Sequence, residues 1–278
     1  INPSKAKKNN VSDYDFYNSF LKLHNKKFFK VSNFNLESKN DIKFFKNQKF
    51  DLGLCVGWQR LLPQEILSKF KFGVFGWHGS FLKLPDGAGR SPINWSIRLG
   101  KNKIFHHLFK YDKSIDGGDI FELVKIKILP NNYISDMKLK VNKHILKSSL
   151  RLIHRIIEGK LILNKQIKKK KKIFFPKITI KDCKIYSKKM TTKVAYDLIR
   201  SASHPFPGSY LEDNLKKILI VYKSTIKKEF SKLNNQTLGT LFFYKKKLYL
   251  KLSDGLLRLD EYKFLNNKFI NIKKIICD

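Results

Sequence analysis

Residues 50–80 read FDLGLCVGWQRLLPQEILSKFKFGVFGWHGS, and this stretch decides the fold class. The near-continuous apolar runs at 50–58 and 73–77 are typical of strands that are buried on both faces of a sheet. Pro63 suits the first turn of a short helix between them. Because strands that alternate with helices form mainly parallel sheets, the stretch predicts an α/β domain.

Residues with reactive side chains follow these strands. His78 comes directly after the second apolar run, Trp58 ends the first, and the loop 112–118 follows a later predicted strand. Ligands of parallel sheets lie at the carboxyl ends of the strands, so we expect these segments to gather at one edge. There Asp116 could orient the imidazole of His78 and stabilise its charge. A lone histidine and a turn aspartate are more often structural, and that alternative stays open for both residues.

The remaining hydrophobic patterns predict the other elements. Helical spacing or capping signals mark 13–25, 37–48, 93–99, 133–157 and 192–203, and apolar or alternating runs mark strands at 27–31, 103–112, 120–129, 216–223, 240–252 and 256–264. We therefore expect an α/β domain over residues 1–159, a Lys-rich linker over 160–180 and a β-rich C-terminal domain over 181–278.

The charge of the chain is extreme. There are 58 Lys and Arg residues against 22 Asp and Glu residues, which gives a formal net charge of +36. This balance favours a polyanion partner such as nucleic acid. Alternatively, the excess reflects composition alone, because Lys, Asn, Ile and Phe are abundant while Ala and Arg are scarce, as in proteins from AT-rich genomes. The five adjacent lysines at 168–172 should be exposed and mobile, since like charges repel one another.

The sequence argues against a metal site, a secretory signal and a membrane span. The three cysteines are widely separated and have no metal-binding spacing, so no metal is expected. His106 and His107 would point to opposite faces of one strand, which favours a structural or substrate-lining role. No apolar run approaches the roughly 18 residues of a membrane span, and residues 1–10 carry no signal-peptide pattern. We therefore expect a cytoplasmic protein without a membrane partner.

Several longer motifs resemble a known family. The stretch FGWHGSFLKLPDGAGRSPINW at 75–95, followed by YDKSIDGGDI at 111–120, is similar to the formyltransferases that use 10-formyltetrahydrofolate. This family includes methionyl-tRNA formyltransferase and the amino-sugar formyltransferases, and Gly89–Trp95 especially resembles the latter. DLGLCVGWQRLLPQEIL at 51–67 resembles the family segment that cradles the pterin, and RSASHPFPGSYLEDNLKKILI at 200–220 resembles its β-rich C-terminal domain.

The resemblance implies a fold, a co-substrate and a set of site residues. The implied fold is a Rossmann-like, mainly parallel sheet followed by a small β-rich, OB-like domain, which in methionyl-tRNA formyltransferase touches the tRNA. The implied co-substrate is 10-formyltetrahydrofolate. His78 would stabilise or protonate the formyl oxygen while an amine attacks, with Asp116 as its partner. The implied folate-binding residues are Trp58, Gln59, Arg60, Leu61, Leu62, Asp112 and Ile115, and the implied acceptor-binding residues are Trp77, Arg90 and Trp95.

The chain departs from the family pattern in two places. The family hallmark has a catalytic asparagine two residues before the histidine, where this chain has Gly76. We expect a void there. Loss of an oxyanion donor typically costs about 2.7–4 kcal/mol, so either Asn94, Ser80 or a water substitutes as the donor, or the activity is weak or lost. The family's first strand and helix have no counterpart after Ile1, so we expect an N-terminally incomplete catalytic domain.

The leading hypothesis is transfer of a formyl group from 10-formyltetrahydrofolate to an amine. The Gly89–Trp95 motif favours a nucleotide-linked amino sugar over methionyl-tRNA as the acceptor. If the acceptor is tRNA, the basic linker and the C-terminal domain are the expected contacts. Two alternatives are a hydrolase of the formyl donor and a non-catalytic polyanion-binding relative. Gly76 and the charge favour the latter, whereas His78 and Asp116 oppose it.

Overall fold

The computed structural model of the protein describes residues 18–33, 35–58, 60–213, 216–227, 236–265 and 274–277. The chain divides into two units, residues 1–78, 107–124 and 145–171 and residues 79–106, 125–144 and 172–278. Some elements continue from one unit into the other, and each unit is described here by itself. The boundaries predicted at 159 and 181 stay a prediction.

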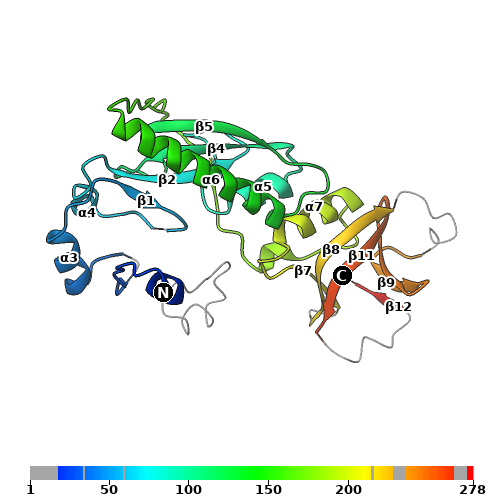
Figure 1. The fold of residues 1–278 in the computed structure, drawn as a ribbon. Helices are drawn as coiled ribbons and strands as arrows, with labels where there is room; N and C mark the ends of the chain where they lie inside the picture. Colours follow the sequence, from blue (N-terminus) through cyan, green and yellow to red (C-terminus); the bar gives the residue numbers. More distant parts are fainter. Residues whose placement is uncertain are drawn as a thin grey trace. The chain divides into compact units, whose positions relative to one another are not determined.

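A four-stranded sheet carries the region around His78. Its strands lie in the order β1 (Gly53–Cys55), β2 (Val74–Ser80), β4 (Lys103–Lys110) and β5 (Ile120–Lys127) (Figure 1). β1 and β2 are parallel, with Cys55 opposite Gly76. The backbone N–H of Tyr111 donates to the carbonyl of Val74 over 2.7 Å, so the end of β4 lies beside the start of β2. The sheet is therefore mixed.

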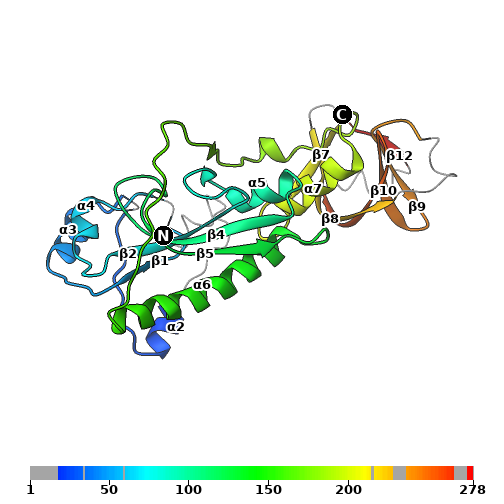
Figure 2. The same cartoon turned by 90° about the horizontal axis from the view of Figure 1, so that it is seen from above.

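The long helix α6 (Ile134–Ile157) covers one face of this sheet, as Figure 2 shows. Phe75, Leu108 and Leu152 are buried together in that interface. Trp77 packs against the same cluster, and its Nε1 donates to Ser148 Oγ over 2.9 Å. Successive side chains of a strand point to opposite faces, so His78 points away from this core. This placement supports a structural role for Trp77, and a contact between its ring and an acceptor stays a prediction.

Some predicted elements differ from the structure. The predicted strand at 27–31 is wrong, because this segment is not a strand and the ring of Phe29 stacks on Phe44 of α3 (Lys39–Lys46). The first part of the helix predicted at 13–25 lies outside the described residues, and α2 covers Asn18–Leu23. β1 is shorter than its apolar run, whereas β2 runs past His78 and includes it.

In the second unit, the glycine-rich loop contains a short strand that pairs with a later segment, and a helix follows this strand. β3 (Ala88–Gly89) pairs with β6 (Phe174–Phe175) in parallel, and α5 (Pro92–Arg98) follows. As predicted, this helix ends just before Gly100, which has a φ of 62°.

In the first unit the short helix α4 (Gln64–Leu67) follows Pro63 as predicted.

The C-terminal part of the second unit is a six-stranded antiparallel sheet with one helix. The helix is α7 (Thr192–Ala202), preceded by a 3-10 turn at Lys181–Cys183. The strand order is β12 (Lys274–Ile276), β9 (Thr240–Tyr244), β10 (Lys247–Leu252), β11 (Gly255–Phe264), β8 (Lys216–Lys227) and β7 (Ser209–Asp213). Apolar side chains of α7 and the sheet form one buried core, including Leu198, Leu211 and Leu250. The predicted α/β domain followed by a β-rich domain is confirmed.

The run predicted as one strand at 240–252 is instead a hairpin. Lys245 and Lys246 have φ values of 46° and 61° and connect β9 to β10. Two successive residues with positive φ are typical of the tight turns that match the twist of paired strands. Sequence patterns hid this turn because neither residue is a glycine or an asparagine.

Candidate functional site

His78 and Asp116 form the centre of the candidate site. The distance from His78 Nδ1 to Asp116 Oδ2 is 3.5 Å, which confirms their predicted proximity. The His78 side chain is 6% exposed and that of Asp116 is 23% exposed. A carboxylate beside Nδ1 favours the tautomer that carries its proton on this nitrogen.

The turn that carries Asp116 is held from two sides. Asp116 has a φ of 49°, a left-handed conformation that aspartate tolerates better than most residues. Gln166 Nε2 donates to the carbonyls of Asp116 and Gly118, over 2.9 and 2.7 Å. A Cβ at Gly118 would lie 1.7 Å from the carbonyl oxygen of Lys110, so only glycine allows this approach. These constraints place the carboxylate independently of any ligand.

The predicted void at Gly76 is wrong. A Cβ at this position would lie 2.2 Å from Tyr111 Cε1 and 2.3 Å from the Tyr111 hydroxyl oxygen, so the tyrosine ring already fills the space. Cys55, which faces Gly76 across β1 and β2, hydrogen-bonds with the Tyr111 side chain. Burial raises the pKa of Tyr111 well above its usual range, and Cys55 and Asp116 raise it further. Burial also raises the pKa of the Cys55 thiol.

The predicted folate-binding residues supply exposed apolar surface in the same unit. Leu61 is 53% exposed and Ile115 is 50% exposed, while Trp58 is half-buried. Asp112 Oδ1 accepts hydrogen bonds from the backbone N–H and the hydroxyl of Ser114, over 2.7 and 2.6 Å. Apolar side chains beside turn backbone are the lining expected for a flat aromatic ligand. Arg60 is exposed, Leu62 is half-buried, and Gln59 lies outside the described residues.

Four predicted site residues belong to the second unit, and most of them already have structural partners. Asn94 Nδ2 donates to the carbonyl of Ser201 over 2.8 Å, in a buried position. Trp95 Nε1 donates to Pro176 O over 2.9 Å. Ser80 is fully buried, and its Oγ accepts from the N–H of Leu82 over 3.1 Å. These bonds give Asn94, Trp95 and Ser80 structural roles, and their predicted catalytic or binding roles stay predictions. The side chain of Arg90 is exposed.

The tandem histidines are buried, as a structural role requires. His106 Nδ1 lies 2.6 Å from Nδ1 of His144, and the two rings meet edge to face. His106 and His107 are both less than 2% exposed. Among the described residues, no group of three or more His, Cys, Asp or Glu side chains could hold a metal ion.

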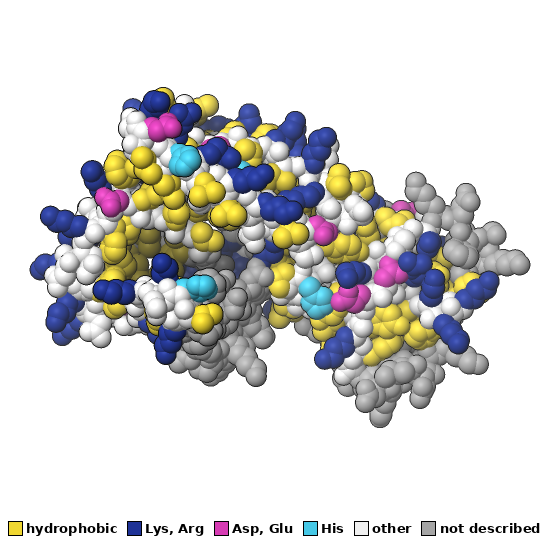
Figure 3. Space-filling model, in the orientation of Figure 1, with side chains coloured by type: hydrophobic (Ala, Val, Ile, Leu, Met, Phe, Trp, Pro, Cys, Tyr) yellow, Lys and Arg dark blue, Asp and Glu magenta, His cyan; other side chains and the backbone are white. Residues whose placement is uncertain are grey.

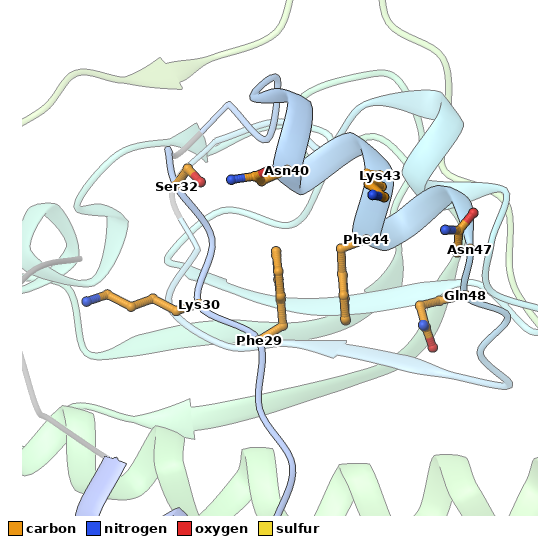
Figure 4. Close-up of a pocket in the computed structure, with 8 residues that line it drawn as sticks. All are labelled: Phe29, Lys30, Ser32, Asn40, Lys43, Phe44, Asn47 and Gln48. Atoms are coloured by element: carbon orange, nitrogen blue, oxygen red, sulfur yellow. The ribbon is translucent and has the colours of Figure 1, made fainter.

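Figure 4 shows a hollow of the first unit, lined by residues 29–48 and not by the predicted site residues. It has a volume of about 420 Å³ and is lined by Phe29, Lys30, Ser32, Asn40, Lys43, Phe44, Asn47 and Gln48. The rings of Phe29 and Phe44 stack on each other with centroids 3.8 Å apart. They therefore leave no room between them for a third ring, and the hollow offers amides and two cations instead.

Basic side chains are spread over the surface. In the face seen in Figure 3, Lys and Arg occur across the described parts instead of gathering in one patch. Lys168–Lys171 are exposed as predicted, whereas Lys172 is half-buried. In the described part of the chain, no helix is long and apolar enough to cross a bilayer.

Sequence reasoning overlooked three residues of this site. Tyr111 begins the quoted motif YDKSIDGGDI, and its place at the end of a predicted strand could have drawn attention to it. Cys55 carries no motif of its own, because the three cysteines are widely separated in the chain. Gln166 carries no local signal, because it contacts the Asp116 turn from 50 residues away in the chain.

The chain shares sequence and fold with known formyltransferases. Methionyl-tRNA formyltransferase of Fusobacterium nucleatum is 26% identical over 279 residues, which covers 95% of this chain and 86% of that protein. The enzyme of Buchnera aphidicola with the same name is 26% identical over 231 residues, covering 83% of this chain and 71% of that protein.

Solved structures with low sequence identity show the same fold. Methionyl-tRNA formyltransferase from Clostridium thermocellum has a TM-score of 0.60 at 18% identity, covering 95% of this chain and 92% of that chain. The N-formyltransferase from Helicobacter canadensis, in complex with folinic acid and dTDP-3-aminofucose, has a TM-score of 0.61 at 18% identity and covers 88% and 82%. HypX from Aquifex aeolicus, in complex with tetrahydrofolic acid, has a TM-score of 0.63 at 16% identity; it covers 78% of this chain, which spans 36% of HypX.

The family model described as formyl transferase matches residues 5–150. This match covers more than half of the 278 residues and includes both His78 and Asp116. The protein belongs to the formyl transferase family.

Proposed function

We propose that this protein moves a formyl group from 10-formyltetrahydrofolate to a primary amine, with His78 and Asp116 as the catalytic pair. The observation that carries the proposal is the distance of 3.5 Å between His78 Nδ1 and Asp116 Oδ2 in a partly open setting. A histidine that is held by a carboxylate can accept and return a proton near neutral pH.

In the proposed step, the amine nitrogen forms a bond to the formyl carbon, and the π electrons of the carbonyl move to the oxygen. His78 Nε2 accepts the proton that the amine loses. The electron pair on the oxygen then re-forms the carbonyl while the bond from the formyl carbon to the folate nitrogen breaks. The electron pair of that bond goes to the folate nitrogen, and His78 returns the proton to it. Asp116 stabilises the imidazolium that forms in between, while the oxygen needs a separate donor.

The residues that would bind the folate fit a flat, partly apolar ligand. Leu61 and Ile115 expose apolar surface in the unit that contains His78. The Asp112–Ser114 hydrogen bonds shape the loop between Tyr111 and Asp116, so its backbone is ordered for polar contacts. The folate supplies the formyl group, and these residues would bind and orient it.

For the acceptor, we propose methionyl-tRNA. The curated relatives above carry that name, and one of them aligns with 95% of this chain. The formal net charge of +36 suits a polyanion, whose binding strengthens as counterions are released. The exposed lysines at 168–171 are candidate contacts. A cytoplasmic location stays a prediction.

An amino-sugar nucleotide is the second candidate acceptor. The Gly89–Trp95 motif supports it, and Arg90 is exposed as a phosphate-binding residue would be. However, the side chains of Asn94 and Trp95 already donate hydrogen bonds to the carbonyls of Ser201 and Pro176, which weakens this support.

The test supplies the protein with 10-formyltetrahydrofolate and either charged initiator tRNA or a panel of amino-sugar nucleotides. Release of tetrahydrofolate that depends on one acceptor identifies the reaction. If the acceptor is tRNA, the affinity for it, and with it the transfer rate at low tRNA concentration, should fall steeply as the salt concentration rises. Folate binding without transfer to either class, at any salt concentration, would contradict the proposal.

A further inference from the structure

Tyr111 occupies the place where the family hallmark has an asparagine. A Cβ at Gly76 would lie 2.2–2.4 Å from Cε1, Cζ and the hydroxyl oxygen of Tyr111, distances at which two atoms cannot coexist. The absence of a side chain at position 76 and the presence of this ring therefore depend on each other. A larger residue at 76 would displace the ring.

The hydroxyl oxygen of Tyr111 is also about as far from the Cβ position of residue 76 as the amide nitrogen of an asparagine there would be. With a carbon–carbon bond of about 1.52 Å and an amide carbon–nitrogen bond of about 1.33 Å, the amide nitrogen of an asparagine lies about 2.4 Å from its own Cβ. The Tyr111 hydroxyl oxygen lies 2.3 Å from the ideal Cβ position at Gly76. A donor group thus lies at the same distance from position 76, although it comes from the residue after β4 and not from β2.

The surroundings keep the phenol neutral and hold its oxygen. Burial, then the neighbouring Cys55 and Asp116, raise the pKa of Tyr111, so the hydroxyl keeps its proton at every pH where the enzyme could work. The pKa of Cys55 is also raised by burial, so its thiol keeps a proton. The hydrogen bond between the two side chains raises the pKa of Tyr111 and lowers that of Cys55, so the phenol donates to the sulfur. Sulfur is a weak acceptor, so the phenolic O–H can turn to a formyl oxygen that develops negative charge.

We propose that Tyr111 is a catalytic residue that donates a hydrogen bond to the formyl oxygen as negative charge develops there, in place of the asparagine of the family. Cys55 acts as a positioning residue for the phenol. The inference rests on the proposed function and supplies the donor that the step above requires. No bond to Tyr111 forms or breaks, since the phenol keeps its proton throughout.

The first test is Tyr111→Phe, which keeps the ring over Gly76 and removes the hydroxyl. An oxyanion donor acts on the transition state, so kcat should fall about 100- to 1000-fold while the KM for folate changes less than about twofold. Tyr133→Phe is the matched control, because it removes a hydrogen-bonded hydroxyl from another half-buried tyrosine, outside the site. It should leave kcat within about twofold of wild type.

The second test exchanges the two positions. Gly76→Asn alone should be slow and less stable, because the new side chain meets the Tyr111 ring. Tyr111→Ala alone should be slow for lack of a donor. The double variant Gly76→Asn with Tyr111→Ala frees the space for the amide and should be at least tenfold faster than Tyr111→Ala.

These results separate the inference from the proposed function. If wild type transfers formyl groups and Tyr111→Phe keeps at least half of its kcat, the role of Tyr111 is wrong while the enzyme stands. A loss confined to KM would assign the hydroxyl to folate binding and overturn the role as well. A double variant no faster than Tyr111→Ala would contradict the claim that phenol and amide share one position. If wild type itself transfers nothing, the proposed function fails first.

Discussion

Two ionic pairs built around an aspartate, one in each unit, differ in kind. In the second unit, the distance from Arg200 Nη2 to Asp197 Oδ1 is 2.5 Å, and the two side chains are 3% and 5% exposed. Arg200 Nη1 also donates to the carbonyl of Asn132 over 2.5 Å. In the first unit, His78 and Asp116 are 3.5 Å apart, and the aspartate is partly open to solvent.

The difference shows which pair is structural. The Arg200 pair is short, buried and tied to backbone carbonyls, so it fixes α7 against the segment before α6. This pair supports stability because neither buried charge is left without its partner. The His78 pair is longer and more accessible, and it sits on a turn with a left-handed residue. Sites that accept strain and exposure at once are often functional.

The largest expected effect tests the looser pair. His78→Gln removes the proton acceptor while keeping a polar side chain of similar length. We expect kcat to fall about 1000-fold, since a positioned acid–base residue contributes roughly 100- to 10,000-fold. Tetrahydrofolate release measures the rate, and thermal unfolding checks the fold. His154→Gln, on an exposed position of α6, is the control and should match wild type. A His78→Gln enzyme within tenfold of wild type would make both pairs structural.

Next comes the tight pair. Asp197→Asn leaves the Arg200 guanidinium buried without its carboxylate, and breaking such a pair costs about 3–5 kcal/mol of unfolding free energy. Urea unfolding at neutral pH measures this loss. Glu158→Gln is the control, since its pair with Arg155 is exposed and should be worth about 1 kcal/mol or less. If Asp197→Asn proves as stable as the control, the contrast between the two pairs is broken.

A third effect concerns the partner of His78. Asp116→Asn removes the charge that stabilises the imidazolium but keeps the left-handed turn, which asparagine tolerates well. Gln166 donates to backbone carbonyls of this turn, so its hydrogen bonds should survive. We expect kcat to fall about 100-fold with unfolding free energy within about 1 kcal/mol of wild type. Asp136→Asn, which changes the carboxylate that accepts from the N–H of Tyr133, is the matched control for rate. An unchanged rate would show that His78 works without its carboxylate.

Much of the fold follows from local patterns in the sequence. Apolar runs and helical spacing predict β2, α5, α6 and α7, because β2 is buried along nearly its whole length and each helix buries one face. The predicted strand at 27–31 fails because Phe29 packs against α3 instead of entering a sheet. Tertiary contacts decide such short apolar runs, and a single sequence does not reveal them.

The candidate site was predictable only in part. His78 and Asp116 follow recognisable patterns, so their proximity could be expected. The contents of the space beside Gly76 could not, because a glycine is compatible with a void, a water molecule or a side chain from elsewhere. Tyr111 reaches that space through the pairing of β4 with β2, a long-range feature with no local signal.

The smallest expected effect sharpens the contrast between the site and the structural interior through Tyr133, a second half-buried tyrosine. The Tyr133 hydroxyl donates to the carbonyl of Ser224 and accepts from its N–H, each over 3.1 Å. Tyr133→Phe should therefore cost about 1–2 kcal/mol of unfolding free energy and leave kcat unchanged. Tyr111→Phe should do the reverse, lowering kcat with little loss of stability.

The pH dependence of stability gives this prediction a second readout. Burial raises the pKa of Tyr133 to about 12, from an ordinary value of 10.0. Below pH 10 the phenol is neutral in the folded and unfolded chain, and its contribution is complete. Above that, the unfolded chain loses the proton first, so the unfolding free energy should fall as pH rises towards about 12. The difference in urea midpoint between wild type and Tyr133→Phe, measured from pH 8 to about pH 10.5, should therefore shrink with rising pH, because the variant lacks this group while the lysines titrate in both proteins. A difference that stays constant would mean that the Tyr133 hydroxyl ionises as readily in the folded protein as in the unfolded chain.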